Sequence, residues 1–210
     1  MLLAGIHLMP DLSGALVCPK ERLVAVSDPI GDWNTRQAPA LAAEALKRLG
    51  SLLRQRRPAK LVWLGDALPN LLAAGKLAKR EADEVARQCQ AVEWHWVAES
   101  LPAGLPSTSA VELTMGGLTY RHIGKAAATA EVSCAPWPLA TTEAGTWPCY
   151  VIDGKRLVIP PFGPRADGMD VLSPHFQALF RRPFNVLMLA GGRIVTRHRS
   201  RLTAPGRATT

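Results

Sequence analysis

Two aspartates follow apolar runs that have the form of buried strands. The run 61–64 ends in Gly65-Asp66, and the run 23–27 ends in Asp28. Strands buried on both faces are apolar throughout, and open α/β sheets bind ligands beyond the carboxyl ends of their strands. Paired carboxylates at such an edge are half of a two-metal hydrolase site, because they neutralise and bridge the cations. The sequence therefore predicts that Asp28 and Asp66 share one sheet edge.

The first half of the chain alternates strand and helix patterns around these aspartates. An opening hairpin is expected within 5–18, and apolar runs predict strands at 22–27, 60–64 and 91–97. Leucines and alanines at helical spacing predict a helix over 37–57, and a polar helix is expected over 75–90. A loop rich in Pro, Ser and Gly fills 98–110.

The second half consists mainly of short strand candidates. A short helix is expected at 173–180, and Asp153-Gly154 is a typical two-residue hairpin turn. The predicted strands are 111–115, 117–122, 130–134, 148–153, 156–160, 184–190 and 193–197. This order predicts the α/β class, with one sheet joined by helix crossovers and packed against a second, more antiparallel sheet.

The bulk properties indicate one globular domain. The chain has 210 residues, of which 48% are hydrophobic, and no run approaches the ~20 apolar residues that span a membrane. We expect a domain over 1–197 and a basic, flexible tail over 198–210. The N-terminus shows no signal-peptide pattern, and four scattered cysteines without a CxxC pair argue against a zinc site. These features predict a cytoplasmic protein with reduced thiols and no membrane contact.

The positive charge is concentrated at the C-terminal end. The formal net charge is +8, and 171–210 contain seven arginines but no Lys, Asp or Glu. This distribution fits either a nucleic-acid or acidic partner or a solvated tail that aids solubility. No aromatic residues interleave these arginines as a stacking platform requires. The candidates for nucleic-acid binding are Arg193, Arg197, Arg199 and Arg201.

Two segments carry a resemblance to a known family. The segments 61–66 and 148–163, the second with its Pro-Pro-Phe-Gly ending, resemble the calcineurin-like metallophosphoesterase superfamily. Within it the chain is most similar to the ligase-associated DNA damage response endonuclease group, over 5–195. The resemblance implies a metallophosphoesterase-like αββα sandwich of two mixed sheets flanked by helices. It also implies a site for two metal ions ~3.5–4 Å apart.

The family's metal-binding motifs are only partly retained. DxH falls on 28–30 and keeps Asp28, and GDxxH falls on 65–69 and keeps Asp66. The family's lone histidine matches His122. GNH[DE] falls on 98–101, where Glu99 takes the place of the asparagine ligand. The resemblance therefore leaves Asp28, Asp66 and His122 as vestigial metal ligands, with Glu99 as a substitute.

At the remaining positions of these motifs, the histidines that bind metal in the family are replaced by other residues. Isoleucine, proline and serine replace the histidines at Ile30, Pro69 and Ser100. GHxH falls on 134–137, where Ala135 and Trp137 stand for the histidines. We expect the bulky or rigid residues Pro69, Pro136 and Trp137 to fill the space of ions and substrate.

These losses predict a catalytically inactive protein with no catalytic residue. By resemblance it would be a scaffold or partner-binding protein in bacterial DNA repair, beside an ATP-dependent DNA ligase and a helicase. No cofactor is expected, or at most one weakly bound Mn²⁺ or Zn²⁺. Two alternatives stay open: a residual one-metal phosphodiesterase or phosphatase, and a nucleic-acid-binding module that uses the arginine-rich end.

Each candidate also has a structural interpretation. Asp66 fits a helix or turn cap, Asp28 fits the opening of an Asp-Pro turn, and His122 fits a hydrogen-bonded residue at a strand end. Glu99 fits a solvated loop carboxylate. Trp94 and Trp96 point to one face of their strand and are expected in the core.

Overall fold

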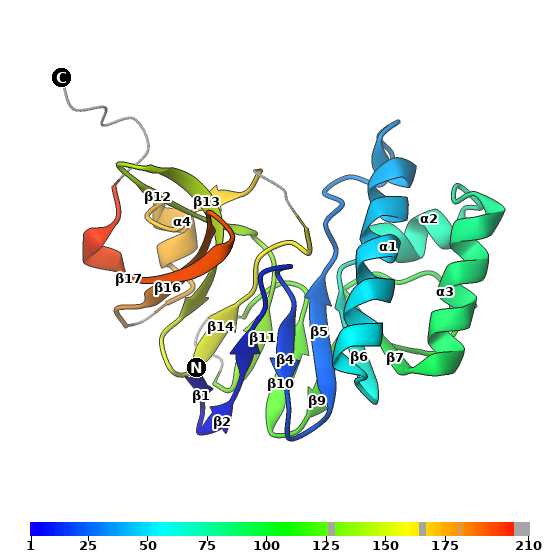
Figure 1. Cartoon of the computed structure of the whole chain (residues 1–210), viewed down its shortest axis with the longest axis horizontal. Coiled ribbons are helices and arrows are strands. Elements are labelled where there is room, and N and C mark those ends of the chain that lie inside the picture. The colour runs from blue at the N-terminus through cyan, green and yellow to red at the C-terminus, as the bar shows by residue number, and fades with distance from the viewer. Residues whose placement is uncertain (126–128, 164–166, 181, 204–210) are drawn as a thin grey trace.

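The computed structural model describes residues 1–125, 129–163, 167–180 and 182–203. Two sheets pack face to face, and helices cover their outer faces (Figure 1). Helices α1 (Ala38–Arg56), α2 (Ala67–Ala73) and α3 (Lys79–Ala91) lie against the six-stranded sheet, and α4 (Pro174–Gln177) lies against the nine-stranded sheet. The predicted class, an αββα sandwich of two mixed sheets, is confirmed. Among the described residues, none of the helices is long and apolar enough to cross a membrane.

The six-stranded sheet places its central strands in register. Its order is β3 (Met9–Pro10), β4 (Leu16–Cys18), β5 (Leu23–Ser27), β6 (Lys60–Leu64), β7 (Glu93–Val97) and β8 (Thr108–Ala110). The strands from β5 to β8 are parallel, and Ser27 pairs with Leu64, which pairs with Val97. Parallel strands that end level deliver their next residues to one edge. Asp28, Asp66 and Glu99 therefore emerge at the same edge, as the sequence predicts for the two aspartates.

The nine-stranded sheet contains the predicted short strands and two that the sequence patterns did not predict, β12 and β15. A separate two-stranded ribbon, β1 (Leu2–Leu3) with β2 (Ile6–His7), opens the chain. The nine strands are β9 (Glu112–Met115), β10 (Leu118–Arg121), β11 (Glu131–Ser133), β12 (Pro138–Thr142), β13 (Gly145–Ile152), β14 (Arg156–Val158), β15 (Met169–Asp170), β16 (Asn185–Ala190) and β17 (Arg193–His198). The long strand β13 pairs with β12, β14 and β16 along different parts of its length.

Helix α2 corrects the expected layout of the first half. The sequence predicted one helix over 75–90, but α2 occupies 67–73 and α3 begins at Lys79. Pro69 does not stop α2, because it lies in the first helical turn, where a missing N–H leaves no intrahelical bond unmade. The sequence suggested that Pro69 would fill the space of ions and substrate. Pro69 is instead a buried residue of α2 that does not line the cavity at the strand ends.

Strand alternation divides the apolar residues among three cores. Along β6, Leu61 and Trp63 point toward α1–α3, while Val62 and Leu64 point into the interface between the sheets. Successive strand residues face opposite sides, so a continuous apolar run fills two cores at once. Trp63, Trp94 and Trp96 form one cluster, with ring centroids 4.6 to 6.1 Å apart. The core position expected for Trp94 and Trp96 is confirmed.

A buried ion cluster joins three strands of the second sheet. Glu131 on β11 is fully buried and lies 2.9 Å from Arg121 of β10 and 3.0 Å from Arg156 of β14. A buried carboxylate without cations would be strongly destabilising, so the three groups depend on one another.

Regular structure continues past residue 197. Residues Arg199–Arg201 form a 3₁₀ helix, and the Thr203 N–H donates to the Thr141 carbonyl at 2.9 Å. The expected tail from 198 therefore begins with packed structure, and 204–210 lie outside the described residues.

Candidate functional site

A cavity of about 350 Å³ lies beyond the carboxyl ends of β5 and β6. It brings together three of the predicted residues, Asp28, Asp66 and His122, whereas Glu99 does not line it. Its other walls are largely apolar. They are Ile30, Gly31, Gly65, Ala135, Pro136, Trp137, Gly168 and Met169.

Asp28 is held by three protein donors. One carboxylate oxygen, Oδ1, accepts the Ile30 N–H at 3.0 Å, as the predicted Asp-Pro turn requires. The other, Oδ2, accepts the Leu68 N–H at 2.7 Å and the Trp63 indole N–H at 3.1 Å. Leu68 lies in the first turn of α2, whose leading N–H groups need acceptors from outside the helix. Asp28 therefore caps α2 from the neighbouring strand.

Burial governs the ionisation of Asp28. The side chain is almost fully buried, and this desolvation raises its pKa from 3.8 to about 6. The three hydrogen bonds act in the opposite direction because they favour the carboxylate, and the negative charge of Asp66 adds to the upward shift. Asp28 is therefore a poorly solvated carboxylate that already accepts three protein N–H groups.

Asp66 lacks the capping bond that the sequence suggested. It stands at the N-cap position of α2, but its side chain accepts no capping hydrogen bond. Gly65 brings it to the cavity with φ +127°, and a Cβ added at Gly65 would lie 2.5 Å from the Asp28 Cβ. Glycine at this position permits the two strand ends to approach closely.

Glu99 and His122 pair with each other. His122 Nδ1 lies 2.9 Å from Glu99 Oε2, and Glu99 Oε1 accepts the Ile123 N–H at 3.1 Å. His122 follows the end of β10, so the hydrogen-bonded histidine expected at a strand end is confirmed. A carboxylate that accepts from Nδ1 fixes the imidazole orientation and leaves Nε2 as the other ring nitrogen.

Trp137 forms a wall of the cavity. Its indole N–H donates to Ser27 Oγ at 3.0 Å, which ties the wall to the end of β5. The ring lies beside Gly31, where an added Cβ would be 3.6 Å from two of its atoms. Sequence reasoning singled out Trp137 and Pro136, but it missed Ser27, Gly31, Gly168 and Met169. Gly31 carried a usable indication, since it lies three residues beyond Asp28 in the same loop.

The donors do not fit two metal ions. Asp28 accepts two N–H groups at Oδ2 and one at Oδ1, so it has at most one lone pair left, at Oδ1, to add to Asp66 and the Nε2 atom of His122 as donors at the cavity. Within the described part of the chain, no group of three or more His, Cys, Asp or Glu residues is arranged to hold a metal ion. A two-ion hydrolase site requires several ligands for each cation.

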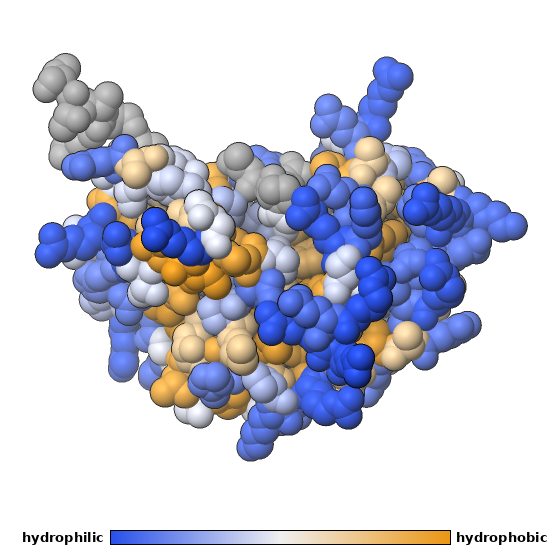
Figure 2. Space-filling model, in the orientation of Figure 1, coloured by the Kyte–Doolittle hydropathy of each residue, from blue (hydrophilic) through white to orange (hydrophobic). Residues whose placement is uncertain are grey.

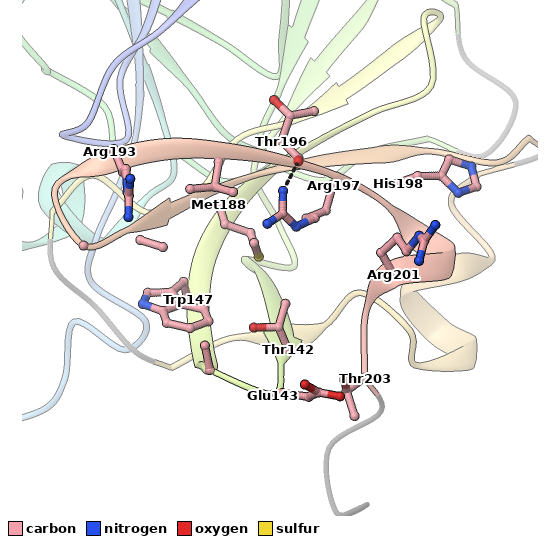
Figure 3. A pocket seen from close by; sticks show the side chains of 14 residues that line it. Thr142, Glu143, Trp147, Met188, Arg193, Thr196, Arg197, His198, Arg201 and Thr203 are labelled. Carbon is pink, nitrogen blue, oxygen red and sulfur yellow. Dashed lines mark hydrogen bonds between the residues drawn. The ribbon is translucent and has the colours of Figure 1, made fainter.

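The arginine candidates divide into two sets. Arg193, Arg197 and Arg201 line a larger groove of about 930 Å³ on the second sheet (Figure 3). Arg199 instead turns away, with its guanidinium donating to Gln177 Oε1 at 2.8 Å and lying over the Phe184 ring. Hydrophobic and hydrophilic side chains lie next to each other over β16 and β17 (Figure 2).

Comparison with known proteins identifies the fold. No family model and no curated protein sequence matches the chain. The crystal structure of the Pseudomonas putida nuclease MPE matches with a TM-score of 0.73 and 21% sequence identity, over 94% of this chain and 98% of that one. The predicted sandwich of two mixed sheets flanked by helices is thus confirmed, and this chain has the fold of that nuclease.

Proposed function

We propose that this chain is a metallophosphoesterase-fold protein that binds partners and does not hydrolyse phosphoesters. The observation that carries the proposal is the state of Asp28. An aspartate that ligates a cation must direct a lone pair at it. Asp28 is buried and already accepts three protein N–H groups, two of them at Oδ2. It therefore serves as a structural acceptor for α2 and Trp63.

The walls of the cavity support the same proposal. Trp137 and Ile30 occupy positions where the family has metal-ligating histidines, and both contribute apolar surface to the cavity. A largely apolar cavity with one further carboxylate suits a small ligand or a partner side chain better than a hydrated metal pair.

One observation favours a residual one-metal hydrolase as the second candidate. The Glu99–His122 pair has the arrangement in which a carboxylate orients a histidine toward a metal. Asp66 lines the same cavity as His122, so one weakly held Mn²⁺ or Zn²⁺ would find two protein donors there.

Metal loading separates the two candidates. We would incubate the protein with Mn²⁺ or Zn²⁺, remove free metal, measure bound metal by mass spectrometry and assay bis-p-nitrophenyl phosphate hydrolysis. The binding proposal predicts that the protein retains no stoichiometric metal. It also predicts that any background hydrolysis is the same in the wild type and in Asp66→Asn. Asp83→Asn, an exposed carboxylate on α3, is the matched control. Stoichiometric metal with turnover that is lost in Asp66→Asn but kept in Asp83→Asn would overturn it.

The cellular context is part of the proposal. On the strength of the resemblance, the proposed setting is DNA repair in a bacterial cytoplasm, with an ATP-dependent DNA ligase or a helicase as the partner. Direct binding of the purified partners by calorimetry tests this context, and absence of binding to both would contradict it.

A further inference from the structure

A groove of about 930 Å³ combines an apolar floor with cationic walls. Its apolar lining comes from Trp147 of β13, Met188 and Ala190 of β16, and Val195 of β17, and Figure 3 labels Trp147 and Met188 of this set. Arg193 and Arg197 of β17 and Arg201 of the following 3₁₀ helix stand around this floor.

Strand pairing explains why these residues share one face. Met188 pairs with both Cys149 and Val195, and Ala190 pairs with Arg193. Directly paired residues lie on the same face of a sheet. The face is the one that carries the α4 core, because Met188, Trp147 and Val195 belong to that cluster. The groove is therefore on the outer face of the nine-stranded sheet and shares no lining residue with the Asp28 cavity.

The three groove arginines have no carboxylate partner among the described residues. All three side chains are exposed, and no ion pair joins any of them to a described acidic group. Glu143 is the acidic residue among the described groove-lining residues, so cations outnumber anions there. The guanidinium of Arg197 donates to the Thr196 carbonyl at 3.1 Å, a contact that leaves its charge uncompensated.

The spacing of the charges suits a polymeric anion. The backbone positions of Arg193 and Arg197 are four residues apart on one strand, which corresponds to roughly 13 Å. At this spacing the two guanidinium groups can each hold a separate phosphate of one chain. Trp147 adds an aromatic side chain from β13, the interleaved residue that the sequence of the C-terminal end lacks. Cations spaced along a groove with an aromatic platform are the features that bind single-stranded nucleic acid.

We propose that this groove binds single-stranded nucleic acid, with phosphates on Arg193, Arg197 and Arg201 and a base against Trp147. A duplex keeps its bases stacked inside and has none to offer to the indole. An acidic peptide matches the charges but not the aromatic floor. The proposal does not depend on whether the Asp28 cavity is catalytic, because the two sites have no residue in common.

Fluorescence anisotropy with a labelled 20-nucleotide oligo(dT) and the full-length chain tests the proposal. Three phosphate contacts predict a slope of about −2 in log K against log salt, since single strands give about −0.7 for each contact. The triple variant Arg193→Ala/Arg197→Ala/Arg201→Ala should flatten the slope to near zero. Trp147→Leu, which keeps apolar volume, should weaken binding about fivefold or more.

A charge-matched triple variant provides the control. Arg36→Ala/Arg54→Ala/Arg80→Ala removes three exposed arginines from outside the groove and should retain at least the larger part of the affinity and the salt slope. Thermal unfolding curves confirm that both triple variants fold. Equal losses in the two triple variants, or competition by poly-glutamate or by duplex DNA as effective as that by unlabelled oligo(dT), would overturn the proposal. Asp66→Asn should bind the oligonucleotide like the wild type, which separates this test from that of the cavity.

Discussion

Replacing Asp28 by asparagine should change how the stability of the protein depends on pH. Burial raises the pKa of Asp28 from 3.8 to about 6, so the folded state binds this proton more tightly than the unfolded state. The stabilisation of the folded state by proton binding to Asp28 is fully present below the unfolded pKa near 4. It is lost as the pH rises through the folded pKa near 6, and the contribution of Asp28 is then constant.

The size of the effect follows from the shift. A difference of about two pKa units corresponds to roughly 3 kcal/mol, because one unit is worth about 1.4 kcal/mol. Asp28→Asn cannot titrate, so this pH-dependent component disappears in the variant. The variant does place an amide group among the three N–H donors, which leaves one donor unsatisfied. That penalty is the same at every pH and cancels when two pH values are compared.

Urea unfolding followed by tryptophan fluorescence measures the difference. The probe is well placed, because the Trp63 indole donates to Asp28. The free energy of unfolding of the wild type minus that of Asp28→Asn should fall by about 2.4 kcal/mol between pH 4 and pH 7, because part of the effect is already lost at pH 4. A difference that stays constant over this range would refute a buried Asp28 with a raised pKa.

A second variant checks the cause of the shift. The negative charge of Asp66 contributes to raising the Asp28 pKa, although less than desolvation does. The stability contribution of Asp28 changes over a pH window between its unfolded and its folded pKa. Asp66→Asn should therefore move the upper end of this window downward without removing the window. A window that is absent in Asp66→Asn would mean that repulsion, rather than burial, controls the ionisation.

Two further variants test the packing around the site and in the second sheet. Gly65→Ala should destabilise the protein by about 3 kcal/mol or more in urea unfolding, because its Cβ would meet that of Asp28 at a positive φ. The control Gly154→Ala, which has a positive φ but open space around it, should lose only about 1–2 kcal/mol. Glu131→Gln should lose roughly 3–5 kcal/mol because the buried Arg156 would be left without its carboxylate and Arg121 would keep only Glu112, whereas Glu112→Gln, at an exposed carboxylate, should lose much less.

The sequence predicted the elements whose patterns are long or strongly periodic. The helix expected over 37–57 is α1, and the runs ending at Ser27, Leu64 and Val97 are β5, β6 and β7. The strand patterns are reliable because each of these strands is buried on both faces, so nearly every residue in the run has to be apolar. Helix α2 was not predicted, and its sequence contains Pro69, three residues after Asp66. Its position in the first turn, which makes it harmless, depends on where the helix begins.

The composition of the site was predictable, but its hydrogen bonds were not. Level strand ends bring Asp28 and Asp66 to one edge, and this follows from two similar apolar runs. The bonds from Trp63 and Leu68 to Asp28 depend on how α2 packs across β5, which no local pattern records. The position of Trp147 beside the C-terminal arginines likewise arises from the pairing of β13 with β16, which joins segments distant in the sequence.

The two aspartates that looked equivalent in the sequence have different roles in the fold. Without the Asp28 carboxylate, the Leu68 N–H, the Ile30 N–H and the Trp63 indole would all lack this acceptor in a buried site, and each unsatisfied donor costs about 1–3 kcal/mol. That structural requirement holds with or without a metal ion. Asp66 makes no capping bond and lines the cavity. Any remaining ligand chemistry of the cavity therefore centres on Asp66, and Asp28 is accounted for by the folding of α2.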